Sequence, residues 1–263
     1  MKHLGWIGLA ALGAASVAVL ADEPARPAFK IPPGYIAAEN VPDSAQLVPP
    51  APARKSGAEQ RDKAASKTAL AAHGTPRWTV ATSDADLFTP KATGALSCAA
   101  GFDISAQATP ALDKLLRRVM IDFGLATGKA KKLYNRDRPF EVNKRPMCTP
   151  EITRMLEADG SYPSGHSAIG YGWGMVLAQL VPDRTTQLMA RGRAFGESRR
   201  FCNVHWQSDV EEGRVIAAAV FARLQTEPAY QADLQAARDE LSKTPRQAPS
   251  RDCAAEAAAL AGG

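Results

Sequence analysis

The chain has 263 residues, 45% of them hydrophobic, and a formal net charge of +5. This length and composition allow one domain with a substantial core and exclude a chain that is disordered throughout. The balance of 32 basic against 27 acidic residues suits anionic ligands. It is too mild to indicate nucleic-acid binding, and an excess of this size is more often a matter of solubility.

The first 21 residues have the organisation of a secretory signal peptide. Lys2 supplies the positive charge, residues 4–20 are apolar and rich in Gly and Ala, and the small residue Ala21 ends a suitable cleavage site. We expect cleavage after Ala21; an uncleaved N-terminal anchor is the alternative. Beyond this segment no apolar run approaches the roughly 18 to 20 residues of a membrane span. The sequence therefore predicts a periplasmic or secreted protein, not held by a membrane after cleavage.

Residues 22–57 form a proline-rich segment, which we expect to be extended and to wrap over the domain or link to it. From 58 to 242 the pattern becomes helical. After Pro110, apolar residues recur every three or four positions, as on one face of a helix; they are Leu112, Leu115, Leu116, Val119, Met120 and Phe123. Helices are also predicted over 59–74, 166–180, 209–224 and 230–241.

Strand formers do not alternate with polar residues anywhere in the sequence, and no internal repeat is found. We therefore predict an all-α, single-domain helical bundle, with an Ala-rich tail over 243–263. The chain has four cysteines, Cys98, Cys148, Cys202 and Cys253. In an exported chain they favour disulfides, for which three pairings are possible. None lies in a CxxC pair, which argues against zinc or thioredoxin-like chemistry.

The stretch KKLYNRDRP contains Lys131 and Arg138, seven residues apart. On a helix they would lie nearly on the same face, two turns apart. Pro139 disfavours helix at Arg138 and marks the end of the segment. Taken alone, these residues indicate no more than a solvated basic helix end.

The stretch GSYPSGHSAIGYG, from Gly160 to Gly172, places a histidine at the head of an apolar helical pattern. Pro163 can set the first turn, and Ser164 is a good N-cap. The amides of Ser164 and Gly165 would then be unpaired donors at the positive end of a helix, which favours an anion. His166 would lie beside that anion and could donate a proton. The alternative is a simple helix start with a partly buried histidine.

The stretch SRRFCNVHWQSD contains Arg199, His205 and, four residues after the histidine, Asp209. If a helix begins near His205, the histidine and the aspartate meet on one face. A carboxylate that accepts from one imidazole nitrogen fixes the tautomer and leaves the other nitrogen free as a nucleophile. The alternative is a surface His/Asp pair with a solvated arginine.

Together the three stretches predict more than any one of them does. Three cations and two helix amides would form a cage for a tetrahedral dianion, with one histidine as a nucleophile and the other as an acid. Phosphoryl transfer needs such positioning and charge neutralisation more than it needs a strong base.

The pattern K-x6-R-P, P-S-G-H and S-R-x5-H-x3-D resembles the signature of the type 2 phosphatidic acid phosphatase superfamily, which includes vanadium-dependent haloperoxidases. Every signature position is filled in this chain. The longer strings GSYPSGH, HWQSDV, GTPRW and VPDSAQLVPPAP are more similar to the bacterial class A non-specific acid phosphatases. The resemblance extends over roughly residues 35–242.

The resemblance implies an all-helical fold, a homo-oligomer, no metal or other cofactor, and a phosphohistidine intermediate. It also implies hydrolysis of many phosphomonoesters, such as nucleotides and aryl and sugar phosphates, and in some members phosphate transfer to alcohols such as nucleosides. His205 would be the nucleophile, Asp209 its orienting partner and His166 the general acid. The phosphate oxygens would bind Lys131, Arg138, Ser164, Gly165 and Arg199. His205 must start neutral and His166 protonated, so we expect surroundings that move their pKa values apart.

With these stretches brought to one phosphate, Cys148 and Cys202 are expected to pair, which leaves Cys98 for Cys253. Three other functions remain as alternatives. A vanadate-dependent haloperoxidase would use the same cage, a membrane lipid phosphatase would need spanning helices, and a non-catalytic phosphate-binding protein would have no use for His166 and Asp209.

Overall fold

The amphipathic segment that begins at Pro110 forms helix α5, Pro110–Leu125, as its apolar spacing predicts. Pro110 lies in the first turn, where its missing N–H has no intrahelical partner to lose. The six apolar residues of the predicted face are all at most 3% exposed. Their burial places α5 in the main hydrophobic core.

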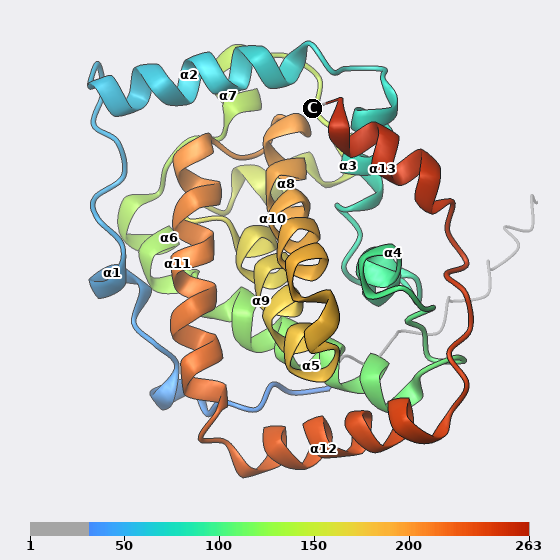
Figure 1. Cartoon of the computed structure of the whole chain (residues 1–263). Helices are drawn as coiled ribbons and strands as arrows, with labels where there is room; N and C mark the ends of the chain where they lie inside the picture. Colours follow the sequence, from blue (N-terminus) through green and yellow to red (C-terminus); the bar gives the residue numbers. More distant parts are fainter. Residues whose placement is uncertain (1–31, 263) are drawn as a thin grey trace, which may run out of the picture. The chain divides into compact units, whose positions relative to one another are not determined.

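The computed structural model describes residues 32–262, so the predicted signal peptide lies outside the described residues. Helix α9, Gly165–Leu180, packs against α5, against α10, Thr185–Phe201, and against α11, Gln207–Leu224. Figure 1 shows these four helices side by side in the middle of the part of the chain formed by residues 32–262. They form the bundle that carries the three predicted stretches.

The remaining elements lie around the bundle, with α2 along one end and α12 along the other (Figure 1). The α-helices are α1 Ser44–Leu47, α2 Gly57–Leu70, α3 Pro76–Ser83, α4 Ser97–Ala100, α6 Gly128–Tyr134, α7 Pro139–Asn143, α8 Thr153–Glu157, α12 Pro228–Lys243 and α13 Cys253–Ala261. The 3₁₀ helices are Ala38–Asn40, Ala92–Leu96, Pro150–Ile152 and Pro182–Arg184. Residues 32–262 contain no strand, and the prediction of an all-α fold is confirmed.

Two local predictions need correction. The first predicted helix, over 59–74, ends at Leu70 instead of Gly74, which follows a series of turns and has a φ of +78°. Helix α10 was not predicted from the sequence. This helix carries several charged residues and two glycines, so it lacks the regular apolar spacing on which the other predictions depended. Helix α10 packs against α9, and this packing does not require a regular apolar spacing within α10.

The proline-rich segment is tied to α5 by hydrogen bonds near residue 35. The amides of Tyr35 and Ile36 donate hydrogen bonds to the buried carboxylate of Asp122, at 2.9–3.0 Å. Gly34 precedes them, and an added Cβ there would lie 2.2 Å from Asp122 Oδ1. The close approach of this backbone to α5 therefore requires glycine.

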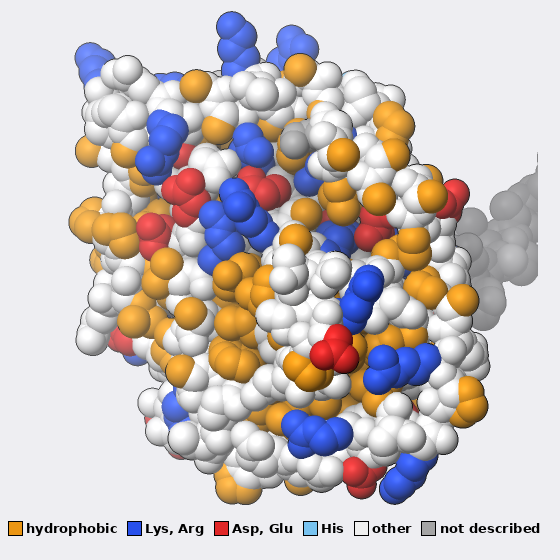
Figure 2. Space-filling model, in the orientation of Figure 1, with side chains coloured by type: hydrophobic (Ala, Val, Ile, Leu, Met, Phe, Trp, Pro, Cys, Tyr) orange, Lys and Arg blue, Asp and Glu red, His pale blue; other side chains and the backbone are white. Residues whose placement is uncertain are grey.

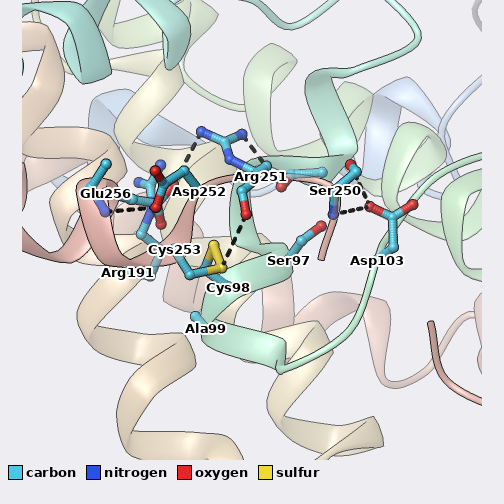
Figure 3. The surroundings of a disulfide bond; sticks show 12 residues. Ser97, Cys98, Ala99, Asp103, Arg191, Ser250, Arg251, Asp252, Cys253 and Glu256 are labelled. Carbon is cyan, nitrogen blue, oxygen red and sulfur yellow. Dashed lines mark hydrogen bonds and ion pairs between the residues drawn. A yellow bond between two sulfur atoms is a disulfide. The ribbon is translucent and has the colours of Figure 1, made fainter. Parts of the chain in front are cut away.

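The cysteines pair as expected, Cys98 with Cys253 and Cys148 with Cys202. The first disulfide joins the start of α13 to α4 (Figure 3). Close to it, the buried Glu256 of α13 accepts a hydrogen bond from Arg191 Nε of α10 at 3.1 Å. The Ala-rich tail therefore contains a helix that is fixed to the domain by a covalent bond and by a buried ion pair.

The surface in Figure 2 carries acidic and basic side chains close together over α10 and α11, below α2. Glu197 of α10 pairs with Arg214 of α11 at 3.0 Å and with Arg200 of α10 at 3.2 Å. Arg61 of α2 pairs with Glu211 of α11 at 3.2 Å. These ion pairs join α2, α10 and α11 through side chains of opposite charge.

Candidate active site

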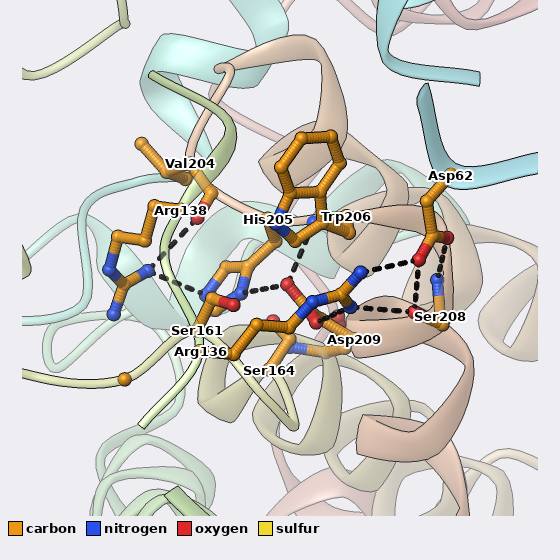
Figure 4. Close-up of polar contacts among 12 residues, drawn as sticks. Asp62, Arg136, Arg138, Ser161, Ser164, Val204, His205, Trp206, Ser208 and Asp209 are labelled. Carbon is orange, nitrogen blue, oxygen red and sulfur yellow. Dashed lines mark hydrogen bonds and ion pairs between the residues drawn. The ribbon is translucent and has the colours of Figure 1, made fainter. Parts of the chain in front are cut away.

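The three predicted stretches converge at one end of the bundle (Figure 4). The residues between α6 and α7 supply Arg138, the start of α9 supplies Ser164, and the turn between α10 and α11 supplies His205. Asp209 follows in the first turn of α11. All four of these side chains are at least 97% buried.

The basic stretch does not form the single helix face that its spacing suggested. Helix α6 ends at Tyr134 because Asn135 adopts a left-handed conformation, with a φ of 38°. Arg138 is extended and is the N-cap of α7. The prediction that Lys131 and Arg138 share a helix face is therefore wrong.

The two cations nevertheless meet, because both bind the loop that leads to α9. Lys131 Nζ lies 2.9 Å from Asp159 Oδ2 and also donates to the carbonyl of Gly160. Arg138 Nη2 donates to the carbonyl of Asp159 at 2.9 Å and lies 3.3 Å from Asp159 Oδ2. This loop brings together the two cations that the predicted helix would have aligned.

His205 is held from both sides of its ring. Nη1 of Arg138 lies 3.2 Å from Nε2 of His205, and Nδ1 lies 3.3 Å from Oδ2 of Asp209. A guanidinium can only donate and a carboxylate can only accept. The two contacts therefore favour the tautomer with the proton on Nδ1 and a lone pair on Nε2, which is the arrangement of a neutral nucleophile.

The surroundings of His205 favour its neutral form. Burial lowers the pKa of His205 well below its usual value, and the positive charges of Arg138, Lys131 and Arg199 lower it further. The pKa of Asp209 is raised by burial, and this rise is opposed by Arg136 and by the backbone amide of Trp206. That amide donates to Asp209 Oδ2 at 2.7 Å.

The start of α9 differs from the prediction in one donor. The Ser164 hydroxyl caps the helix, accepting from the amide of Ser167 at 3.3 Å. The Ser164 amide, however, donates to the carbonyl of Asp209 at 2.9 Å, so the prediction that it is unpaired is wrong. Helix α11 lies so close here that an added Cβ on Gly213 would be 2.4 Å from the Ser164 carbonyl. The amide of Gly165 lies in the first turn of α9, where backbone amides have no intrahelical partner, and it can donate a hydrogen bond to an anion bound at this helix end.

His166 is oriented by a loop that the sequence analysis did not consider. Its Nε2 lies 3.1 Å from the carbonyl of Ala85, which can only accept, so Nε2 carries a proton. Nδ1 is then the nitrogen that can gain or lose the second proton. Its ring stacks against that of Phe195 of α10, with the ring centroids 6.3 Å apart.

The pKa of His166 is lowered well below its usual value, chiefly by burial, then by Arg199 and, more weakly, by His205 and Arg138. Burial and the same arginines therefore lower the pKa values of both histidines. A phosphate dianion between these cations would oppose their effect and raise both values.

Arg199 is the side chain that most directly indicates an anion. It is 1% exposed, and within residues 32–262 its Nε and Nη1 atoms have no hydrogen-bond partner. Burial, together with Arg138, lowers the pKa of its guanidinium to about 9. Buried polar groups in proteins almost always have partners, so two unpaired guanidinium donors beside His166 and His205 indicate a ligand with oxygen acceptors.

Two groups that contact the predicted residues, Asp159 and Arg136, were not predicted from the sequence. Asp159 pairs with both cations of the basic stretch. Arg136 pairs with Asp209 at 2.6 Å and with Asp62 of α2 at 2.7 Å. Arg136 lies within the KKLYNRDRP stretch and could have been considered there, but Asp62 lies 74 residues earlier in a polar helix that gives no signal.

Comparison with known proteins identifies the family. Residues 116–228 match the PAP2 superfamily. The chain is 41% identical, over 196 residues, to the non-specific acid phosphatase of Salmonella typhimurium, an alignment that covers 74% of this chain and 78% of that protein. The chain belongs to the non-specific acid phosphatase family. The resemblance drawn from the motifs is thereby confirmed.

Two further relatives agree with this family. The non-specific acid phosphatase of Providencia stuartii is 36% identical over 224 residues, covering 81% of this chain and 90% of that protein. The acid phosphatase of Zymomonas mobilis is 37% identical over 179 residues, covering 68% of each chain. Among residues 32–262 we find no helix with the length and apolar character needed to cross a membrane.

Proposed function

We propose that this acid phosphatase is exported and hydrolyses a broad range of phosphate monoesters through a phosphohistidine at His205. The observation that carries this proposal is the arrangement around His205: its Nε2 lone pair lies beside Arg138, in the region of the unpaired donors of Arg199. A family member with this geometry can hold a phosphate and attack it with the same set of groups.

In the first step, the Nε2 lone pair attacks phosphorus while the ester P–O bond breaks. Lys131, Arg138, Arg199 and the start of α9 bind the other phosphate oxygens and neutralise their charge. The leaving oxygen takes a proton from Nδ1 of His166, because Nε2 stays hydrogen-bonded to Ala85. Asp209 stabilises the charged ring of His205 through Nδ1.

In the second step, a water molecule attacks phosphorus and gives its proton to the now neutral His166. The N–P bond breaks, phosphate leaves and His205 is neutral again. An alcohol in place of water would take the phosphoryl group instead, which is how phosphotransfer to nucleosides would occur. Both steps use the same acid–base residue, as microscopic reversibility suggests.

Export is supported by the signal-like first 21 residues and by the two disulfides, which persist in oxidising compartments. The proposed substrates are small phosphomonoesters, with no cofactor. Within the described residues no cluster of three or more His, Cys, Asp or Glu side chains is placed to hold a metal ion. In the proposed mechanism Lys131, Arg138 and Arg199 neutralise the charge of the phosphate, which is the role that a metal ion has in many other phosphotransferases.

A rapid-quench experiment tests the mechanism. Wild-type protein and the His205→Ala variant are mixed with a labelled phosphomonoester in EDTA and quenched in base, in which phosphohistidine survives. We expect label in the wild type only, on the peptide that contains His205. Label on Ser164 or Ser198, or a complete loss of wild-type turnover in EDTA that a divalent ion restores, would contradict the proposal. A halide-oxidation assay with vanadate and peroxide tests the haloperoxidase alternative in the same preparation.

A further inference from the structure

Arg136 bridges two buried carboxylates at the back of the site. Its Nη1 donates to Asp209 Oδ1 at 2.6 Å, and its Nη2 donates to Asp62 Oδ2 at 2.7 Å. Both aspartate side chains are 0% exposed, and that of Arg136 is 12% exposed. Figure 4 shows Arg136 between them, with Ser208 at the same junction. A planar guanidinium can hold two carboxylates in fixed directions, which an ammonium group cannot do.

Asp62 holds Arg136 in place and joins α2 to the start of α11. Its Oδ1 accepts from the Ser208 amide at 2.8 Å, and its Oδ2 accepts from the Ser208 hydroxyl at 2.6 Å. The Ser208 hydroxyl also accepts from Arg136 Nη1 at 2.8 Å. The aspartate, the serine and the arginine therefore form one network of hydrogen bonds.

The network determines how Asp209 faces His205. Arg136 occupies Oδ1 of Asp209, so Oδ2 is left to accept from His205 Nδ1 at 3.3 Å and from the Trp206 amide at 2.7 Å. Without Arg136, the carboxylate could rotate about its Cβ–Cγ bond, and its buried negative charge would lose the cation paired with it.

We propose that Arg136, held by Asp62, is a positioning residue for the phosphohistidine reaction: it orients the carboxylate of Asp209 toward Nδ1 of His205 and keeps that carboxylate charged at acid pH. This inference rests on the proposed function. It adds to that mechanism a pair of residues, from α2 and from the segment between α6 and α7, that do not touch the phosphate.

The acid limb of the activity profile follows from the charges around the His205–Asp209 pair. Asp209 faces Arg136 and His205, and His205 faces the cations Arg138, Lys131 and Arg199. Because Arg136 is a cation, its removal raises the proton affinity of the pair, whichever member takes the proton. Protonation of the pair inactivates the nucleophile, so the acid limb moves to higher pH in a variant without this charge.

Four variants separate positioning from simple stabilisation. Arg136→Met removes the cation, Arg136→Lys keeps a charge without the planar fork, and Ser208→Ala removes one junction of the network without changing any charge. Arg61→Ala is the matched control, because Arg61 and Glu211 form an exposed ion pair between the same two helices. For each we measure the melting temperature, the single-turnover phosphorylation rate of p-nitrophenyl phosphate, KM and the pH profile.

For Arg136→Met we expect a rate about 10- to 100-fold lower, by analogy with the loss found when the outer partner of a metal-binding histidine is removed. KM should change little, and the acid limb should move to higher pH. Arg136→Lys should lose rate while its acid limb stays near that of the wild type. Ser208→Ala should lose rate to a smaller extent, and Arg61→Ala should match the wild type.

The inference is overturned if folded Arg136→Met, or both Arg136→Lys and Ser208→Ala, keep the wild-type rate and acid limb. Should Arg136→Met not fold, the decision rests on the other two variants. An inactive wild type would instead refute the proposed function, and so would a His205→Ala variant as active as the wild type. The failure of the inference and that of the proposed function can therefore be told apart.

Discussion

Nζ of Lys131 lies 2.9 Å from Oδ2 of Asp159, which also lies 3.3 Å from Nη2 of Arg138. A half-exposed carboxylate is thus paired with two of the cations that the phosphate would bind, and it competes with that phosphate for their charge. Asp159→Asn should therefore make inorganic phosphate a tighter inhibitor. We expect the inhibition constant to fall about 3- to 5-fold, because exposed ion pairs are typically worth about 1 kcal/mol or less.

The matched control for this substitution is Glu157→Gln, which removes the same charge from an exposed residue at the end of α8. The backbone carbonyl of Asp159, which Arg138 also contacts, is unchanged in the asparagine variant. Equal phosphate inhibition in Asp159→Asn and Glu157→Gln would show that the carboxylate does not compete with phosphate.

His166→Ala should affect substrates according to their leaving groups. An alkoxide needs a proton to leave, whereas p-nitrophenolate leaves readily without one. Proton transfer by a positioned side chain is typically worth about 10²- to 10⁴-fold, roughly 3 to 5 kcal/mol of barrier. We therefore expect a loss in this range for the phosphorylation step with glycerol phosphate, and a much smaller loss with p-nitrophenyl phosphate.

Single-turnover kinetics must be used for this comparison, because slow hydrolysis of the phosphoenzyme would hide a difference in the first step. His73→Ala is a suitable control, since His73 is exposed and packs against Trp78. Equal losses with both substrates would mean that His166 positions the phosphate without donating a proton.

The two buried histidines make the stability of the fold depend on pH. An unfolded histidine takes up a proton near pH 6.5, whereas burial lowers the pKa of both His166 and His205 well below that value in the native state. Between these values the unfolded state binds more protons, so the free energy of unfolding falls as the pH drops below about 6.5.

Phosphate should reduce this loss, because a bound dianion raises the pKa of both histidines and binds only the folded protein. We expect phosphate to increase the melting temperature more at pH 5 than at pH 7. His166→Asn should decrease the slope of stability against pH in this range. A phosphate effect that is the same at both pH values would argue against buried, neutral histidines.

Removal of the two disulfides should have different consequences. Each closes a long loop, of 54 residues for Cys148–Cys202 and 155 for Cys98–Cys253, and the chain-entropy model gives about 4 to 5 kcal/mol for either. The double variant Cys148→Ser/Cys202→Ser should also lose activity, because Cys202 lies between Arg199 and His205. Cys98→Ser/Cys253→Ser should lose stability with a smaller change in kcat.

Thermal unfolding and single-turnover rates, measured below the melting temperature of the weaker variant, distinguish the two cases. Each double variant serves as the control for the other, since both remove one disulfide and add two hydroxyls. Equal effects on kcat in the two variants would show that the Cys148–Cys202 bond has no particular role in holding the site.

The sequence by itself determined the features that arise within one or two helical turns. The apolar face of α5, the N-cap at Ser164 and the approach of His205 to Asp209 all follow from spacings of three or four residues. The motifs also predicted the cations and histidines of the candidate site. Such features are local because a helix repeats every 3.6 residues and its caps involve only neighbouring residues.

Only the tertiary structure decided the contacts between segments far apart in the chain. Helix α10 depends on packing against α9, and the meeting of Lys131 with Arg138 depends on the loop at Asp159. The bond from the Ser164 amide to the Asp209 carbonyl joins residues 45 apart in the sequence. Asp62 and Arg136 are 74 apart. No local spacing encodes such contacts, because they depend on how the helices pack around a common core.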